Sequence, residues 1–159
     1  MTLSKLREFL DSHNVKYLVI SHSQAYTAQG VAALAHVSGQ KLAKTVIVKM
    51  DDVLAMAVLP ASFHVDLNRL RTLTGAQTVE LASQPEFKDA FPDCETGAMP
   101  PFGNLYDMPV YADASLAEIE EITFTAGTHR ELVRMSWEDT ARLVNPMIDR
   151  LIYQHAAVA

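Results

Sequence analysis

The chain has one cysteine, no long apolar run and no tract of biased composition, and each absence excludes a class of protein. Cys94 cannot form an intramolecular disulfide, which fits a reducing compartment. No stretch approaches the roughly 20 apolar residues of a membrane span, and the first residues carry scattered charges instead of an apolar leader. We therefore expect a cytoplasmic protein without a membrane partner.

The motifs of several large enzyme classes are also missing. The six histidines form no HxxxH or HExxH pair, and no CxxC is present, so no pattern predicts a metal. A Walker loop, a GxGxxG turn and the GxSxG elbow of serine hydrolases are absent as well. We expect a protein that works without a metal or a cofactor.

The charge balance disfavours DNA as a partner. The net charge is −6, with 13 Lys and Arg against 19 Asp and Glu, whereas binding to a long duplex needs a broad basic surface. Contact with a few phosphates stays compatible with this balance. At 159 residues and 49% apolar content, the chain is predicted to form one domain over 1–159 that buries about two thirds of its unfolded surface.

Apolar periodicity and capping residues predict a mixed α/β (α+β) fold. Asp66 and Gly75 bound a helix, Ser83 and Glu86 form a capping box, and Asp51-Asp52 indicates a hairpin turn. The expected helices are 3–13, 28–37 (capped by Thr27), 67–74, 84–91, a short one at 115–121, one that starts after Ser136, and helical turns within 147–155 beyond Pro146. The expected strands lie within 15–21, 44–60, 77–82, 109–113, 121–127 and 131–136.

The segment CETGAMPPFGNL, residues 94–105, is unusually apolar for a loop. Pro100 and Pro101 remove backbone donors and fix φ, while Gly97 and Gly103 let a ligand approach the backbone closely. Amides beside Gly97 can therefore bind a developing oxyanion. The alternative is a tight loop that only covers a sheet edge.

Lys44 and two histidines are further candidates. Lys44 begins the apolar strand KTVIVK, where a partly desolvated ammonium can hold a carbonyl or phosphate oxygen. The alternative for Lys44, and more strongly for Lys41 and Lys49, is a lysine that extends from the strand to solvent. His129 follows a glycine turn and His22 a strand end, and each is equally compatible with a structural role.

Seven segments together resemble the YbaK/ProX family of aminoacyl-tRNA deacylases, which includes the editing domain inserted in bacterial prolyl-tRNA synthetases. The resemblance extends from about Tyr17 to Leu143. The segments, in order, are QAYTAQGVAA, GQKLAKTVIVK, LASQPEF, TGAMPPFG, VYADASL, FTAGTH and ELVRMSWEDTARL.

The resemblance implies a fold and a set of site residues. The fold would be a compact domain with a central mixed, barrel-like β-sheet flanked by helices. Thr125 departs from the family, where asparagine often precedes Ala-Gly, so this chain has no side-chain amide at that position. The implied catalytic residues are Lys44, Gly97 and Ala98, and the implied substrate-binding residues are Tyr26, Thr27, Met99, Pro100, Pro101, Phe102, Gly127 and His129.

The resemblance also implies the function. The protein would hydrolyse, in trans, the ester of a mischarged tRNA that carries a small amino acid such as Ala or Cys, on tRNA for proline. Its partner would be the acceptor end of aminoacyl-tRNA, whose phosphates can meet Lys41, Lys44, Arg130 and Arg134, and a synthetase is a further partner that it allows. The alternatives are a non-catalytic module that binds aminoacyl-tRNA or a synthetase, and a binder of free amino acids or nucleotides.

Overall fold

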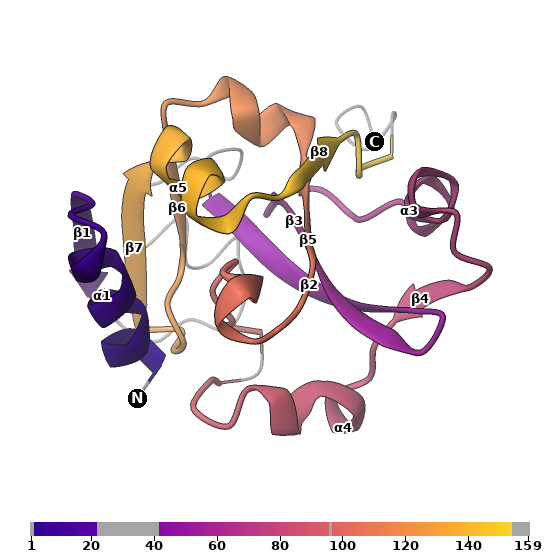
Figure 1. The fold of residues 1–159 in the computed structure, drawn as a ribbon, viewed down its shortest axis with the longest axis horizontal. Coiled ribbons are helices and arrows are strands. Elements are labelled where there is room, and N and C mark those ends of the chain that lie inside the picture. Colours follow the sequence, from indigo (N-terminus) through magenta and orange to yellow (C-terminus); the bar gives the residue numbers. More distant parts are fainter. Residues whose placement is uncertain (1, 22–41, 96, 154–159) are drawn as a thin grey trace.

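The computed structural model describes residues 2–21, 42–95 and 97–153, which form one eight-stranded mixed sheet with helices around it (Figure 1). The strands are β1 (Tyr17–Ser21), β2 (Leu42–Met50), β3 (Val53–Pro60), β4 (Val79–Leu81), β5 (Val110–Asp113), β6 (Glu121–Thr125), β7 (Glu131–Ser136) and β8 (Met147–Asp149). The helices are α1 (Thr2–Ser12), α3 (Leu67–Thr74), α4 (Gln84–Phe87) and α5 (Trp137–Val144), with 3₁₀ turns η1 (Lys88–Ala90), η2 (Gly103–Leu105) and η3 (Ala114–Glu118).

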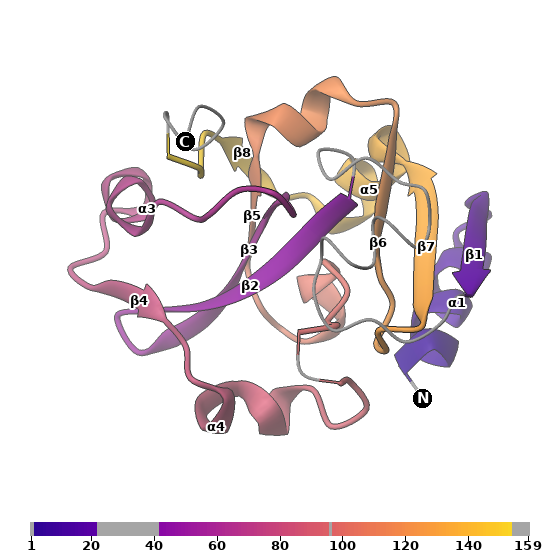
Figure 2. The same ribbon diagram turned by 180° about the vertical axis from the view of Figure 1, so that it is seen from behind.

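The order of the strands confirms the predicted mixed sheet. It runs β1-β7-β6-β2-β3-β5-β8, with β4 added beside β2. Neighbours in the chain pair antiparallel in β2–β3 and β6–β7, whereas β2–β6, β3–β5 and β5–β8 are parallel. The start of β2 therefore lies beside β6, as Figure 2 shows from behind.

The β2–β3 hairpin lies between two apolar cores because its side chains alternate between the two faces of the sheet. The first core lies on the face that α1 covers and includes Leu6, Ile47, Phe102 and Phe124. The second core lies on the other face of the hairpin, around Leu59, Leu70 and Leu151. Every residue of 55–60 is buried as a result.

Local sequence signals account for the ends of several elements. The Asp66 side chain accepts a hydrogen bond from the Arg69 N–H, and Gly75 adopts φ +74° after α3, as a C-terminal glycine should. The predicted Ser83–Glu86 capping box is present at α4. The hairpin turn at Asp51-Asp52 places both residues at positive φ.

The carboxylate that completes this box is further stabilised by a neighbouring strand. Glu86 accepts a hydrogen bond from the Lys49 ammonium at 2.8 Å and another from the Ser83 N–H. The Lys49 contact, followed by those from Ser83, lowers the pKa of Glu86 to about 2. Lys49 is thereby engaged in a surface ion pair, which fits its interpretation as a structural lysine.

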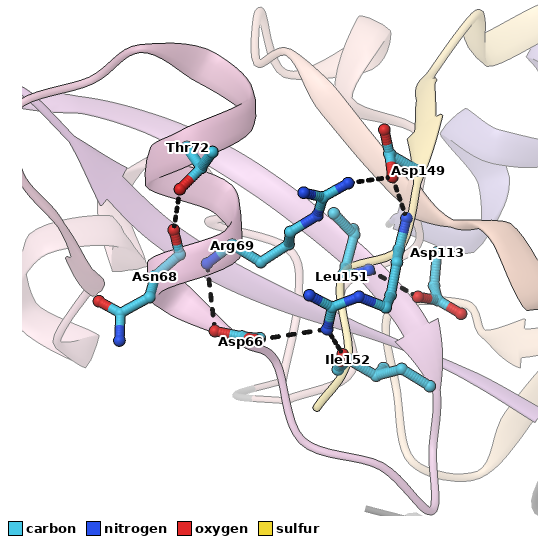
Figure 3. Close-up of polar contacts among 9 residues, drawn as sticks. Asp66, Asn68, Arg69, Thr72, Asp113, Asp149, Leu151 and Ile152 are labelled. Atoms are coloured by element: carbon cyan, nitrogen blue, oxygen red, sulfur yellow. Dashed lines mark hydrogen bonds and ion pairs between the residues drawn. The ribbon is translucent and has the colours of Figure 1, made fainter. Parts of the chain in front are cut away.

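The prediction of helical turns within 147–155 was wrong. Met147–Asp149 forms β8, which pairs parallel to β5, and Ile152 bridges Val65. Two ion pairs tie this segment to α3: Arg69 to Asp149 at 2.8 Å and Arg150 to Asp66 at 3.4 Å (Figure 3). The extended conformation is therefore stabilised by residues more than 30 positions away, which local periodicity cannot reveal.

The expected helix at 115–121 was also too long. It is the 3₁₀ turn η3 at 114–118, and Glu121 already belongs to β6. The buried Asp113 side chain accepts hydrogen bonds from Ser115 at the start of this turn and from the Leu151 N–H at 2.7 Å. The expected helix at 28–37 lies outside the described residues. Among the described helices, none is long and apolar enough to cross a membrane.

Candidate functional site

The apolar loop does not lie at a free sheet edge but is bonded to the turn between β6 and β7. The Glu95 N–H donates to the Gly127 carbonyl at 2.8 Å, and the Gly127 N–H donates to the Ala98 carbonyl at 2.8 Å. These two bonds hold the segment around Gly97 against the Ala-Gly-x-His turn. The structure thus brings together two of the motifs that the sequence singled out.

A third contact involves His129. Its backbone N–H donates to the Glu95 carboxylate at 2.7 Å, so one side chain of the loop holds the far end of the turn. The His129 ring lies beside Gly97, since a Cβ built on Gly97 would be 3.5 Å from the His129 Cε1. Glu95 was not predicted as a site residue, and only its position next to the Gly97 motif in the sequence could have indicated it.

The second half of the loop is buried in the first core. Residues 98–103 are all buried, and Phe102 is fully inaccessible. Its ring centroid lies 6.0 Å from that of Phe9 and 5.6 Å from that of Phe124. The aromatic residue predicted to bind substrate therefore supports the loop from beneath in this structure.

The other predicted residues of this half also face inward. Met99 is 4% exposed and lines a cavity of about 320 Å³ together with Phe87, Phe91 and Cys94. Pro100 and Pro101 are buried as well. An added Cβ at Gly103 would overlap the Met108 carbonyl oxygen, so only glycine fits at the point where the loop turns back.

The backbone amides beside Gly97 differ in availability. The Ala98 N–H donates to the Glu95 carbonyl at 3.0 Å and closes a turn. The Gly97 N–H has no hydrogen-bond partner among the described residues, and Gly97 itself is exposed with φ +83°. The amide that remains open to a ligand is thus that of Gly97.

Lys44 lies on the face of β2 opposite the first core. Ala43 and Ile47 belong to that core, so the alternation of a strand directs Lys44 to the other face. Ala43 is opposite Phe124 in the parallel β2–β6 pair, and one step further Lys44 is level with Thr125. Lys44 therefore lies beside the end of β6 from which the Gly127 turn begins.

The ammonium of Lys44 is half-buried and has no counter-charge among the described residues. Its desolvation by burial lowers the pKa of Lys44 below the usual 10.5. Among the residues that the structure describes, no carboxylate forms an ion pair with it, in contrast to Lys49 on the same strand. An unpaired, partly desolvated ammonium is suited to bind an anionic or carbonyl oxygen.

Three predicted residues cannot be placed: Tyr26, Thr27 and Lys41 lie outside the described residues, as does His22. The described residues of the loop, the Gly127 turn and β2 form the candidate site, which is centred on Gly97. In the described part of the chain, no group of three His, Cys, Asp or Glu residues is arranged to hold a metal ion.

Comparison with protein families now identifies the chain. The model of the aminoacyl-tRNA editing domain matches residues 22–143, well over half of the sequence and including Lys44, the Gly97 loop and the His129 turn. The chain belongs to the aminoacyl-tRNA editing domain family. The YbaK-like resemblance drawn from seven short segments is confirmed by this match.

Curated relatives of this editing domain include proline–tRNA ligases. Those of Bacillus cereus (strain AH187) and Bacillus mycoides (strain KBAB4) are each 30% identical over 89 residues, which is 56% of this chain. The match spans only 16% of the length of either ligase. The editing domain therefore resembles one part of these larger enzymes.

Solved structures confirm the fold of the editing domain. A crystal structure described as a proposed trans-editing enzyme for prolyl tRNA synthetase superposes with a TM-score of 0.82 at 19% identity, covering 96% of this chain and 97% of that one. The crystal structure of hypothetical protein APE2540 gives a TM-score of 0.85 at 19% identity, covering 94% and 99%. Together they confirm the expected mixed sheet flanked by helices.

A substitution at Gly97 of the editing domain tests whether this residue matters for its backbone conformation or for its exposed amide. Gly97→Ala places an L-residue at φ +83°, and we expect it to cost about 1–2 kcal/mol of unfolding free energy. The new methyl fits sterically, at ordinary contact distance from His129. The methyl would also cover the exposed Gly97 amide. We therefore expect the rate of ester hydrolysis to fall even at a temperature where the variant is fully folded.

Gly75→Ala is the matched control for this experiment. Gly75 has a similar φ of +74°, and a Cβ there meets nothing within 4 Å. We expect a similar loss of stability, measured by urea unfolding, and unchanged activity. Equal activity losses in both variants would show that backbone strain, and not the position of Gly97, limits the reaction.

Proposed function

We propose that this editing domain is a deacylase that acts in trans and hydrolyses the ester of mischarged aminoacyl-tRNA. The observation that supports this most is the joining of the Gly97 loop to the Gly127–His129 turn, beside the strand that carries the unpaired Lys44. An exposed backbone donor and a half-buried cation then lie on neighbouring parts of one fold. Membership of the editing family and the likeness to a proposed trans-editing enzyme support the same reaction.

The proposed step needs no metal. Water attacks the ester carbonyl, the resulting oxyanion accepts a hydrogen bond from the Gly97 N–H, and collapse releases the ribose oxygen, which takes up a proton. Lys44 anchors the terminal adenosine phosphate or the aminoacyl carbonyl. Because no strong base was found in the motifs, the ribose 2′-hydroxyl assists the attacking water. One oxyanion donor of this kind typically contributes about 10²–10³ in rate.

In this mechanism Ala98 positions the loop. Its N–H is already engaged with Glu95, and its carbonyl accepts from Gly127, so it fixes the orientation of the Gly97 amide from both sides. The His129 ring lies beside Gly97 and would contact the bound substrate. The proposed substrates carry small amino acids such as Ala or Cys on tRNA for proline. A synthetase pocket distinguishes amino acids that differ by one methylene by only about 1–3 kcal/mol, so a separate editing site is needed to remove the wrong ones.

Single-turnover deacylation tests the proposal. A panel of Ala-, Cys-, Ser-, Thr- and Pro-charged tRNAs is incubated with excess protein, and the loss of each ester is compared with that in buffer. We expect rapid loss of a small amino-acid ester and no loss of Pro-tRNA for proline. If every ester decays at the buffer rate while the protein still binds charged tRNA, the chain is a non-catalytic module that recognises aminoacyl-tRNA.

A further inference from the structure

Arg134 shares a face of the sheet with Lys44. Its neighbour in β7, Val133, belongs to the first core, so strand alternation places Arg134 on the opposite face. The register sets Arg134 opposite Thr123 of β6, and Thr123 in turn is level with Leu42 of β2. Lys44 follows two residues after Leu42 on the same face. We call the side chains Lys44, Thr123, Thr125 and Arg134 the polar face.

Thr123 orients the Arg134 side chain. The Arg134 Nε donates to the Thr123 Oγ1 at 3.4 Å, and Thr123 is only 2% exposed. The Arg134 side chain therefore leans toward β6. Arg134 itself is half-buried, which limits the conformations that its side chain can adopt.

The outer edge of the guanidinium is available for a ligand. In the described part of the chain, the terminal nitrogens of Arg134 make no hydrogen bond or ion pair, since its Nε bond to Thr123 accounts for its side-chain contacts. A planar fork that is held in place and lacks a carboxylate is the geometry that binds a phosphate through two parallel hydrogen bonds.

The surroundings of the polar face are compatible with an anion. Two strand spacings and two residues separate Lys44 from Arg134, which corresponds to about 12 Å between their Cα atoms. On the described strands, the side chains of this face between and beyond them are apolar or uncharged, except the exposed Glu121 at the end of β6 away from Lys44. Glu121 forms no ion pair with Arg134. Two cations without an ion-pair partner among the described residues thus share one face of a chain whose net charge is −6.

We propose that Arg134, held by Thr123, binds a backbone phosphate of the RNA acceptor end while Lys44 contacts the terminal aminoacylated nucleotide. This rests on the proposed function, and it places one RNA phosphate at the half-buried Arg134 of β7. Arg134 would contribute to binding of the strand and not to the chemical step. Thr123 would be a positioning residue that acts through Arg134.

The test measures binding and hydrolysis separately with the full chain. Binding is followed by fluorescence with a hairpin RNA that ends in the single-stranded CCA of tRNA, over a series of salt concentrations. Hydrolysis is followed with the charged tRNA that the wild type cleaves in the panel. The variants are Arg134→Gln, Arg134→Lys, Thr123→Val and Arg142→Gln, whose arginine is exposed on α5 and paired with Asp139.

For Arg134→Gln we expect about tenfold weaker hairpin binding, a tenfold higher KM with kcat nearly unchanged, and a salt slope reduced by about 0.7. Arg134→Lys should restore the slope but only part of the affinity, because it keeps the charge and loses the fork. Thr123→Val should weaken binding a few-fold with the slope intact, and Arg142→Gln should behave like wild type.

The possible failures are distinguishable. If the wild type binds the hairpin and cleaves the charged tRNA but Arg134→Gln does both equally well, the phosphate role of Arg134 is wrong and the deacylase proposal stands. An equal effect of Arg142→Gln would also overturn the phosphate role of Arg134, because any surface arginine would then support RNA binding. If the wild type neither binds the hairpin nor cleaves any ester, the proposed function fails and the role of Arg134 with it. Unchanged thermal unfolding of the variants checks that each is folded.

Discussion

Lys44→Ala is expected to lower the single-turnover rate of deacylation by about 10² or more while leaving the protein folded. Lys44 has no ion-pair partner in the described structure, so its loss removes the proposed contact with substrate and breaks no ion pair within the described fold. The measurement uses the ester that the wild type cleaves fastest, at saturating protein. A variant with wild-type rate would remove Lys44 from the mechanism.

Lys49→Met is the matched control for Lys44. Lys49 lies on the same strand, but its ammonium binds Glu86 at 2.8 Å at the surface. We expect normal deacylation, together with a rise in the pKa of Glu86 from about 2, because the largest cause of its depression is removed. Loss of activity in Lys49→Met as well would indicate a general effect of strand charge.

The same reasoning gives Lys44→Met a stability signature. Burial lowers the pKa of Lys44 in the folded state, so the charged group destabilises the fold at neutral pH, and this penalty is relieved as the pH rises through the folded value toward 10.5. Replacing it with methionine should raise the melting temperature slightly at pH 7, by about 2–4 °C for each kcal/mol gained. An inactive variant that is at least as stable as the wild type would separate function from folding.

Phe102→Ala is expected to have the largest effect on stability, about 3–5 kcal/mol of unfolding free energy. The ring is fully buried and contacts Phe9 of α1 and Phe124 of β6, so its removal leaves a cavity where helix, loop and sheet meet. Urea unfolding gives the loss directly. Where the variant still folds, the rate of deacylation should also fall, because a displacement of the Gly97 loop by about 1 Å is enough to lower the rate about 10²-fold.

Phe87→Ala serves as the control for Phe102. Phe87 is partly exposed in α4 and packs edge-on against Phe91, with ring centroids 6.3 Å apart. We expect a clearly smaller loss of stability and little change in rate. If Phe102→Ala costs no more than Phe87→Ala, the loop is not anchored by the core and its rigidity must have another source.

Much of the local structure was predictable because its causes are local. Asp66, Gly75 and the Ser83–Glu86 box act within a few residues, and the structure has the caps that they predict. The strands β6 and β7 likewise follow from alternating apolar residues. The helical prediction for 147–155 was wrong over the described residues 147–153, because their apolar spacing suits a helix whereas pairing with β5 and ion pairs to α3 stabilise an extended chain.

The candidate site was predictable only in part. Motif resemblance selected Lys44, Gly97 and His129, and the structure places Gly97 against His129. The bonds that join them could not be foreseen, since Glu95 and Gly127 are more than 30 residues apart. The same holds for the Thr123–Arg134 contact, which depends on the register of two strands.

The division of the Gly97 loop into an exposed half and a buried half limits how this protein can evolve. Residues 98–103 are part of the core, so most replacements there would destabilise the folded state. Selection would eliminate such variants before a new activity could arise. Mutational tolerance is therefore low in the segment that directly follows Gly97, the proposed oxyanion donor. Changes in substrate preference would have to accumulate on other elements around the site, while this loop keeps the chemistry constant.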